Sequence, residues 1–168
     1  MTKHILLIVL FLSILVHLNA QNKNNKQYRN EFKKFMRFIR DTEFKNADTL
    51  ICRNYLCNKQ MFGGVTLFGY GRFGLSEEEK NKFTEQARGD TSKLYISKKL
   101  MKRTMIVADT AKGYWEFSKP VFLRSYLLCA FSYGDHFDPN WDSQKTFLYK
   151  KENGNWSKLF EIGSIKCY

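Results

Sequence analysis

Four runs rich in aromatic and β-branched residues follow one another in the C-terminal part of the chain. They cover residues 114–118, 121–133, 146–151 and 156–162. Runs of this composition, bounded by turn residues, are typical of β-strands. Parallel neighbours need a crossover of a dozen or more residues, usually through a helix, and the connections here are too short for helical crossovers. The sequence therefore predicts an antiparallel β-sheet formed by successive strands.

The last two runs are joined by Glu152-Asn153-Gly154-Asn155. Asn-Gly is the pair most favoured at the centre of a two-residue hairpin turn, because both residues tolerate a positive φ. We therefore expect these two strands to be antiparallel neighbours.

Helical patterns come earlier in the chain. Apolar residues between residues 28 and 44 recur at the spacing of one helical face, with basic residues on the other face. Ser76 and Glu79 form a capping box that begins a second helix, and Gly89 ends it. Residues 94–106 fit either a helix or a strand-to-helix passage. The predicted fold class is α+β, with N-terminal amphipathic helices packed on a C-terminal antiparallel β-meander.

The first 20 residues have the pattern of a cleavable signal peptide. A short basic start precedes an apolar run over residues 5–16, which is too short to span a bilayer, and Ala20 precedes a polar stretch. We expect cleavage after Ala20 and a secreted or periplasmic protein without a transmembrane segment. A flexible polar start over residues 21–27 and a single α+β domain over residues 28–168, with one core, would follow.

The chain carries 28 Lys and Arg against 16 Asp and Glu, a net charge of +12. Removal of Lys3 with the signal peptide leaves about +11. Such a charge attracts any polyanion, so we expect diffuse attraction to anionic envelope surfaces or glycans and no specific nucleic-acid site. Two basic clusters could instead form a dedicated site. The first comprises Lys33, Lys34, Arg37 and Arg40, and the second Lys98, Lys99, Lys102 and Arg103.

Four cysteines lie after the signal peptide: Cys52, Cys57, Cys129 and Cys167. An even number in an exported chain indicates two disulfides, which can pair in three ways. We favour Cys52 with Cys57, which closes a short loop, and Cys129 with Cys167. The spacing of the second pair does not fit a zinc site, so no metal is expected there.

Residues 69–74 match the G-x-G-x-x-G pattern of dinucleotide-binding sites. The following helix begins with three glutamates, which would repel a pyrophosphate at the helix N-terminus. We therefore interpret the glycines as a turn and expect no cofactor.

Residues 134–142 form a polar segment between two predicted strands. His136 is the only histidine left after signal cleavage, and Asp135 or Asp138 could orient its ring in a hydrolase. Asp138, Asn140 and Asp142 have the alternate spacing of calcium ligands, but the glycine and glutamate of an EF-hand loop are missing. We expect a polar loop with no catalytic or metal-binding role.

Other carboxylates, such as Asp109, Glu116 and Glu161, show no spacing that would bring two together as a glycosidase pair. The three tryptophans fit core positions on strands better than sugar-stacking positions.

Two short patterns near the C-terminus are Ser118-Lys119-Pro120-Val121-Phe122 and the Lys151–Trp156 hairpin, in which Asn153-Gly154 precedes Trp156. With these S-x-P-x-F and K-x-N-G-x-W patterns the chain resembles small exported bacterial proteins of unknown function. The resemblance implies the fold and export, and it implies no site. The sequence thus favours an exported, monomeric, non-catalytic binding or envelope-associated module over a hydrolase that uses His136.

Overall fold

A computed structural model describes residues 25–45, 50–62, 74–97, 100–101, 104–107, 113–138 and 141–166. The predicted signal peptide lies outside these residues, as do residues 69–73 of the glycine pattern. By its internal contacts the chain divides into two compact units, Met1–Lys34 and Phe35–Tyr168. The boundary falls within the N-terminal helix.

The N-terminal helix covers residues 25–42. Its apolar face is buried at Phe35, Met36 and Ile39, while Lys33 and Arg37 are exposed. This confirms the amphipathic pattern, because residues three and four apart share one face of a helix. The helix also includes residues 25–27, which we assigned to the polar start; polar residues carry no apolar periodicity that would place them in a helix.

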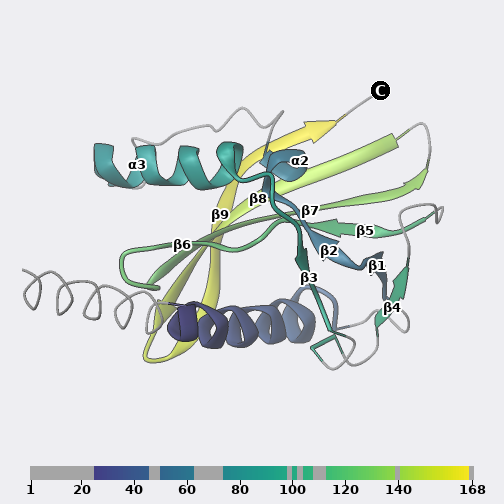
Figure 1. The fold of residues 1–168 in the computed structure, drawn as a ribbon, viewed down its shortest axis with the longest axis horizontal. Helices are drawn as coiled ribbons and strands as arrows, with labels where there is room; N and C mark the ends of the chain where they lie inside the picture. Colours follow the sequence, from purple (N-terminus) through teal and green to yellow (C-terminus); the bar gives the residue numbers. More distant parts are fainter. Residues whose placement is uncertain are drawn as a thin grey trace, which may run out of the picture. The chain divides into compact units, whose positions relative to one another are not determined.

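The fold is α+β, and its main sheet has seven strands in the part that the structure describes (Figure 1). They are β1 (Leu50–Arg53), β4 (Thr104–Val107), β5 (Trp115–Phe117), β6 (Val121–Leu123), β7 (Leu128–Asp138), β8 (Trp141–Glu152) and β9 (Asn155–Lys166). The order is β4-β1-β5-β7-β8-β9, and β6 pairs with β7 beyond the end of β5. A second sheet consists of β2 (Tyr55–Leu56) and β3 (Leu94–Tyr95).

The predicted antiparallel meander is formed by β5 to β9. Asn153 and Gly154 connect β8 to β9 with φ of 50° and 83°, as a tight hairpin requires. The run over residues 121–133, which the composition predicts as one strand, is divided into β6 and β7 by a turn over residues 124–127. Arg124, Ser125 and Tyr126 all have positive φ in this turn.

Strand β1 joins the sheet in a way that the sequence did not predict. It lies between β4 and β5 and runs parallel to both, with Cys52 opposite Trp115 on one side and Ile106 on the other. Parallel neighbours need long connections, and the connection from β1 to β4 contains the other helices. The sequence left open whether residues 94–106 form a helix or a strand-to-helix passage. In the structure, this segment contains β3 and the first residues of β4.

The described part of this connection contains three helical segments: α2 (Asn58–Phe62), α3 (Glu77–Thr84) and a π-helical turn, η2 (Glu85–Gly89). The predicted capping box is present, since the Glu79 amide donates to Ser76 Oγ and the Ser76 amide donates to Glu79 Oε2. The helical run ends at Gly89, as expected. No helix in the described ranges is long and apolar enough to cross a membrane.

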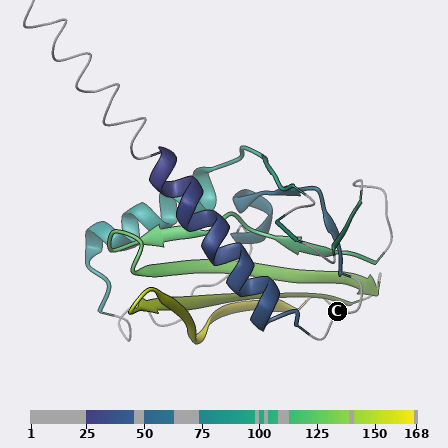
Figure 2. The same ribbon diagram turned by 90° about the horizontal axis from the view of Figure 1, so that it is seen from below.

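Both faces of the sheet are covered within the unit Phe35–Tyr168, because successive strand residues point to opposite faces. On one face, residues 35–42 of the N-terminal helix cross the strands of the sheet (Figure 2). The ring of Phe35 packs against Phe131, Tyr149 and Trp156, with centroids 5.1–5.3 Å apart. On the other face, the helical segments α2, α3 and η2 pack on the neighbouring strand positions. This core consists of Phe62, Phe83, Ala87, Val121, Leu123, Leu128, Ala130, Leu148 and Ile162.

Candidate functional site

Glu116 of β5 is a buried carboxylate that the side chains of Arg53 and His136 contact. Arg53 Nη1 lies 2.7 Å from Glu116 Oε1, and His136 Nε2 lies 3.0 Å from Glu116 Oε2. The side chain of Glu116 is only 6% exposed, whereas that of His136 is 29% exposed. A buried charge is tolerated only when it is paired and hydrogen-bonded. We call Arg53, Tyr114, Glu116 and His136 the Glu116 cluster.

The strand order explains why residues far apart in sequence meet here. β5 lies between β1, which ends with Arg53, and β7, which contains His136. Tyr114 completes the cluster: its hydroxyl accepts a 2.5 Å hydrogen bond from Arg53 Nη2, and its ring stacks on the His136 ring at 4.8 Å. The imidazole is thus held by a ring on one side and a carboxylate at Nε2.

The structure changes the environment expected for His136. Gly134 to Asp138 form the end of β7 rather than a polar loop, and β8 begins at Trp141. The carboxylate that contacts His136 is Glu116, twenty residues away in sequence. Asp135 instead accepts a hydrogen bond from Ser143 Oγ at 2.9 Å. The Asp138 side chain lies outside the described residues.

The structure does not test whether Asp138, Asn140 and Asp142 bind calcium. Asn140 and the side chains of Asp138 and Asp142 are outside the described part of the chain. Asp138 of β7 pairs in register with Trp141 of β8. Among the residues that can be described, no group of three or more His, Cys, Asp or Glu side chains is arranged to hold a metal.

The Glu116 cluster contains one feature that general acid–base catalysis requires, a carboxylate hydrogen-bonded to an imidazole. A carboxylate hydrogen-bonded to a half-exposed imidazole orients the ring and stabilises its protonated form. Here the same carboxylate is also bound to Arg53, which neutralises it and ties β1 to β5. The cluster therefore equally well serves to join three strands.

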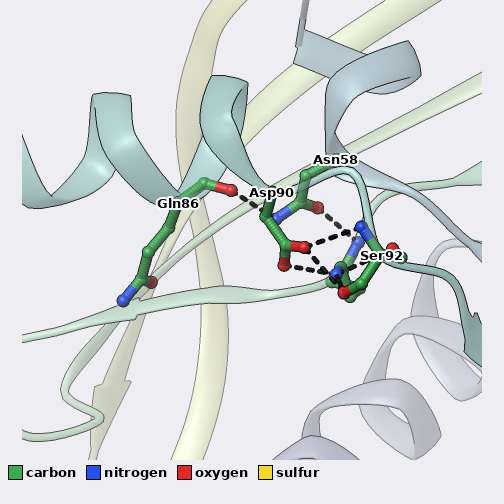
Figure 3. A network of polar contacts seen from close by, with 5 residues as sticks. Asn58, Gln86, Asp90 and Ser92 are labelled. Atoms are coloured by element: carbon green, nitrogen blue, oxygen red, sulfur yellow. Dashed lines mark hydrogen bonds and ion pairs between the residues drawn. The ribbon is translucent and has the colours of Figure 1, made fainter.

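A second polar network surrounds the buried Lys119, just before β6 (Figure 3). Lys119 Nζ donates to Asp90 Oδ2, to Ser92 Oγ at 2.7 Å and to Ser92 O at 2.9 Å. Burial alone would raise the pKa of Asp90, but the hydrogen bonds from Lys119 and Ser92 outweigh it and lower the pKa. The three acceptors match the three donor hydrogens that a lysine ammonium group offers, so the contacts hold the Lys119 side chain in place.

Asn58 of α2 extends this network. Its Oδ1 accepts from the Lys119 amide at 2.7 Å, and its Nδ2 donates to Gln86 O at 2.9 Å (Figure 3). On the other side, Ser118 Oγ accepts from the Ser132 amide at 2.9 Å. The S-x-P-x-F pattern therefore has a structural role, because its polar residues attach the entry of β6 to α2, to the loop at Asp90 and to β7.

Three of the cysteines lie in the described residues. Cys52, Cys57 and Cys129 are buried free thiols, so the structure does not contain the Cys52–Cys57 bond that we favoured. Burial raises the pKa of the Cys52 thiol to about 12 and that of Cys129 well above its ordinary value. Such thiols are poor nucleophiles. Cys167 lies outside the described residues, but Cys129 is a free thiol, so the structure does not contain the expected Cys129–Cys167 bond either.

The small sheet of β2 and β3 carries aromatic and cationic side chains on one face, which we call the β2–β3 face. It comprises Arg53, Tyr55, Lys93 and Tyr95. Tyr55 and Tyr95 are direct cross-strand partners with ring centroids 6.2 Å apart. Lys93 Nζ lies 4.0 Å from the centroid of the Tyr55 ring, and Arg53 Cζ lies 5.6 Å from it. Tyr95 is 67% exposed, whereas Tyr55 is buried.

The sequence contains a signal for this face that we did not use. Arg53-Asn54-Tyr55 and Lys93-Leu94-Tyr95 both repeat a cation, one residue and a tyrosine. Arg53 ends β1 and Lys93 precedes β3, and both cations lie over the Tyr55 ring where β2 pairs with β3. No comparable signal links Glu116 to Arg53 or His136, since their meeting depends on the strand order.

Comparison of the chain with protein-family models, with curated proteins and with solved structures found no match.

Proposed function

We infer that the protein is an exported, non-catalytic binding module that its positive charge draws to anionic surfaces or glycans of the cell envelope. Export rests on the signal-peptide pattern of residues 1–20, and attraction rests on the net charge of +12. The observation that carries the proposal is the spread of exposed cations over several elements. They include Lys33, Lys34 and Arg37 of the N-terminal helix, Lys82 of α3, Lys93, and Lys145, Lys150 and Lys158 of β8 and β9.

The details of the first basic cluster also favour a diffuse field over a dedicated helix site. Arg40 is bound to Asp41 through two nitrogens at 2.6 and 2.7 Å and donates to Leu100 O at 3.1 Å. Lys34 pairs with Glu31 at 3.1 Å. Two of the four cations in that cluster therefore already have acceptors within the protein. The second cluster, around Lys98 and Arg103, lies outside the described residues.

Binding to anionic vesicles, heparin and duplex DNA, measured across a salt series, tests the proposal. A diffuse field is strong when the Debye length is about 30 Å at 0.01 M salt and weak when it is about 8 Å at 0.15 M. We expect all three polyanions to bind with similar affinity at low salt. Affinity should fall steeply as salt rises, because binding releases counterions.

Two triple variants separate a field from a helix site. One replaces Lys33, Lys34 and Arg37 with Gln, and the matched control replaces Lys82, Lys145 and Lys150 with Gln. Both remove three charges from exposed positions, so both should weaken low-salt binding to the same degree. Tight binding to one polyanion that persists at high salt and is lost only in the helix variant would contradict the proposal.

A second candidate function, hydrolysis through His136, is favoured by one observation, the 3.0 Å contact between His136 Nε2 and Glu116 Oε2. In this case Glu116 would orient the imidazole as a general base for water. The binding proposal is preferred because Arg53 shares the same carboxylate and gives the cluster a structural role. Hydrolysis of an ester or glycoside probe that is lost in both His136→Ala and Glu116→Gln would reverse that preference.

A further inference from the structure

The turn between β6 and β7, residues 124–127, places an apolar side chain in solvent. Leu127 is 53% exposed, although Leu123 and Leu128, the strand residues on either side of the turn, are buried. Tight turns are normally built from Gly, Pro, Asn, Asp or Ser, whereas this one reads Arg-Ser-Tyr-Leu. We propose that the turn is the part of the molecule that contacts an anionic lipid bilayer, with the Leu127 side chain inserted among the lipids.

The turn carries side chains at positions where the backbone disfavours them. Arg124, Ser125 and Tyr126 have φ of 48°, 51° and 71°. Glycine adopts this left-handed region without strain, and residues with a Cβ do not. Strain of this kind persists only where the surrounding structure enforces it, and it is concentrated at functional positions. The question is therefore what each side chain of the turn does.

Two of these side chains hold the turn in place. Arg124 Nε lies 2.8 Å from Glu79 Oε1 of α3, and Arg124 Nη2 donates to Gly74 O at 2.6 Å. The Tyr126 ring packs on the Phe122 ring of β6, with centroids 5.3 Å apart. Arg124 and Tyr126 therefore have structural roles that explain why they occupy strained positions.

The backbone of Leu127 is fixed as well. Its amide donates to Arg124 O at 3.0 Å, and its carbonyl accepts from the Lys151 amide of β8 at 2.8 Å. The turn lies at the end of the sheet where β8 also turns into β9 (Figure 1). Because the backbone at Leu127 is already ordered, a partner that binds its side chain pays little conformational entropy.

The small size of this apolar surface favours a bilayer over a protein partner. A stable protein interface buries on the order of 1,000 Å² or more, and Leu127 is the one exposed large apolar side chain of the turn. A bilayer needs no matching surface, because one side chain can enter the acyl boundary while attraction to anionic headgroups supplies the rest.

The electrostatic attraction comes from the whole molecule and not from the turn. Arg124 pairs with Glu79, and the nearby Lys150 pairs with Glu152, so these cations are already partly neutralised. The net charge of the chain is nevertheless +12, which draws it to any anionic surface. This inference rests on the proposed attraction to anionic surfaces and specifies which part of the molecule enters a lipid surface.

Co-sedimentation with vesicles of phosphatidylglycerol and phosphatidylcholine tests the inference at about 0.15 M salt, where the diffuse field is weakened. Leu127→Asn should weaken vesicle binding about fivefold, because roughly half of a leucine side chain no longer leaves water. The matched control is Leu159→Asn on β9, which removes a leucine that is 42% exposed and should leave binding unchanged. Heparin offers charge without hydrocarbon, so both variants should bind it as the unaltered protein does.

Leu127→Trp gives a second readout that does not depend on affinity. Its fluorescence emission, taken as the difference from the unaltered protein, should shift to shorter wavelength on the anionic vesicles and stay unchanged on heparin. Thermal unfolding of each variant checks that the fold is kept.

Equal vesicle binding by Leu127→Asn and the unaltered protein, or an equal loss in Leu159→Asn, would overturn this inference while leaving the charge-based function intact. A concentration-dependent dimer that is lost in Leu127→Asn, with vesicle binding unchanged, would overturn it in favour of a second copy of the chain. No binding of any polyanion at low salt would overturn both this inference and the proposed function.

Discussion

Two tyrosines on neighbouring strands differ in what their hydroxyl groups contact. The Tyr133 hydroxyl donates to Glu43 Oε2 at 3.1 Å. The Tyr149 hydroxyl is buried and has no hydrogen-bond partner among the described residues. Burial, together with the charge of Glu43, raises the pKa of both groups, so both stay protonated. A buried donor without an acceptor costs stability, whereas a satisfied one contributes to it.

We therefore expect opposite effects from the same chemical change at these two positions. Tyr149→Phe removes an unsatisfied hydroxyl and should raise the free energy of unfolding by about 1 kcal/mol. Tyr133→Phe removes a hydrogen bond to a carboxylate and should lower it by about 1 kcal/mol. Urea unfolding of both variants and the unaltered protein measures the difference. Equal destabilisation by the two changes would show that Tyr149 has an acceptor after all.

Asp90 links stability to pH through its pairing with Lys119. Its pKa is lowered in the folded protein from the ordinary value of 3.8, so its contribution is present above that pH and is lost as the pH falls through the lower, folded value. Asp90→Asn should reduce stability at neutral pH, because it leaves the Lys119 ammonium buried without its carboxylate. It should also make the loss of stability below about pH 4 shallower.

Unfolding of Asp90→Asn by urea at several pH values between about 2 and 7 measures this slope. The matched control is Glu78→Gln, which neutralises an exposed carboxylate in the first turn of α3. We expect the stability difference between Asp90→Asn and the unaltered protein to shrink toward the acid end. A constant difference across the series would mean that Asp90 does not titrate with folding.

At the scale of elements, three glycines differ in whether the backbone around them could accept a side chain. Gly154 has φ of 83° in the β8–β9 turn. A Cβ at Gly134 in β7 would lie 2.8 Å from the Ser143 carbonyl oxygen of β8, a contact that only a backbone shift relieves. Gly89, at the end of η2, has ordinary φ and nothing within 4 Å of an added Cβ. Gly154 is thus required by its backbone conformation and Gly134 by the lack of space, whereas neither reason applies to Gly89.

Alanine at these three positions should give three distinct results. Gly134→Ala should lower the free energy of unfolding by about 1–3 kcal/mol through the clash with β8. Gly154→Ala should lower it by about 1–2 kcal/mol, because an L-residue is strained at this φ. Gly89→Ala should be neutral or stabilising by up to about 1 kcal/mol, since it restricts the unfolded chain. Denaturant unfolding ranks the three variants, and a destabilising Gly89→Ala would contradict this account.

The elements that the sequence predicts well are those specified by neighbouring residues. The Asn153-Gly154 turn and the Ser76 to Glu79 capping box depend on φ preferences and hydrogen bonds within a few positions. The parallel placement of β1 could not be predicted, because nothing in its four residues indicates that they pair with strands that contain Thr104 and Trp115. The contacts within the Glu116 cluster depend on that placement. The sequence therefore indicated His136 and Glu116 as separate candidates but could not predict that they meet.

At the scale of the whole molecule, the buried charged groups and the exposed lysines are arranged differently. Acidic groups that are buried or half-buried, such as Glu116, Asp90 and Glu43, are paired with cations of other strands or loops. In the described part of the chain, the exposed lysines lie on helices and strands alike. The composition alone predicted attraction to polyanions, whereas the β2–β3 face needed the pairing of β2 with β3 to bring two triplets together.

The position of β1 also governs the order in which the chain can fold. β5 to β9 pair with strands close in sequence, and such contacts form quickly because little loop entropy opposes them. Residues 50–53, in contrast, meet their partners only after residues 104–107 and 115 have been synthesised. A chain that emerges N-terminus first therefore carries β1 unpaired while residues 54–103 are synthesised. We expect the contacts between Arg53 and Glu116 to form last. The Glu116 cluster would then be completed only at the end of folding.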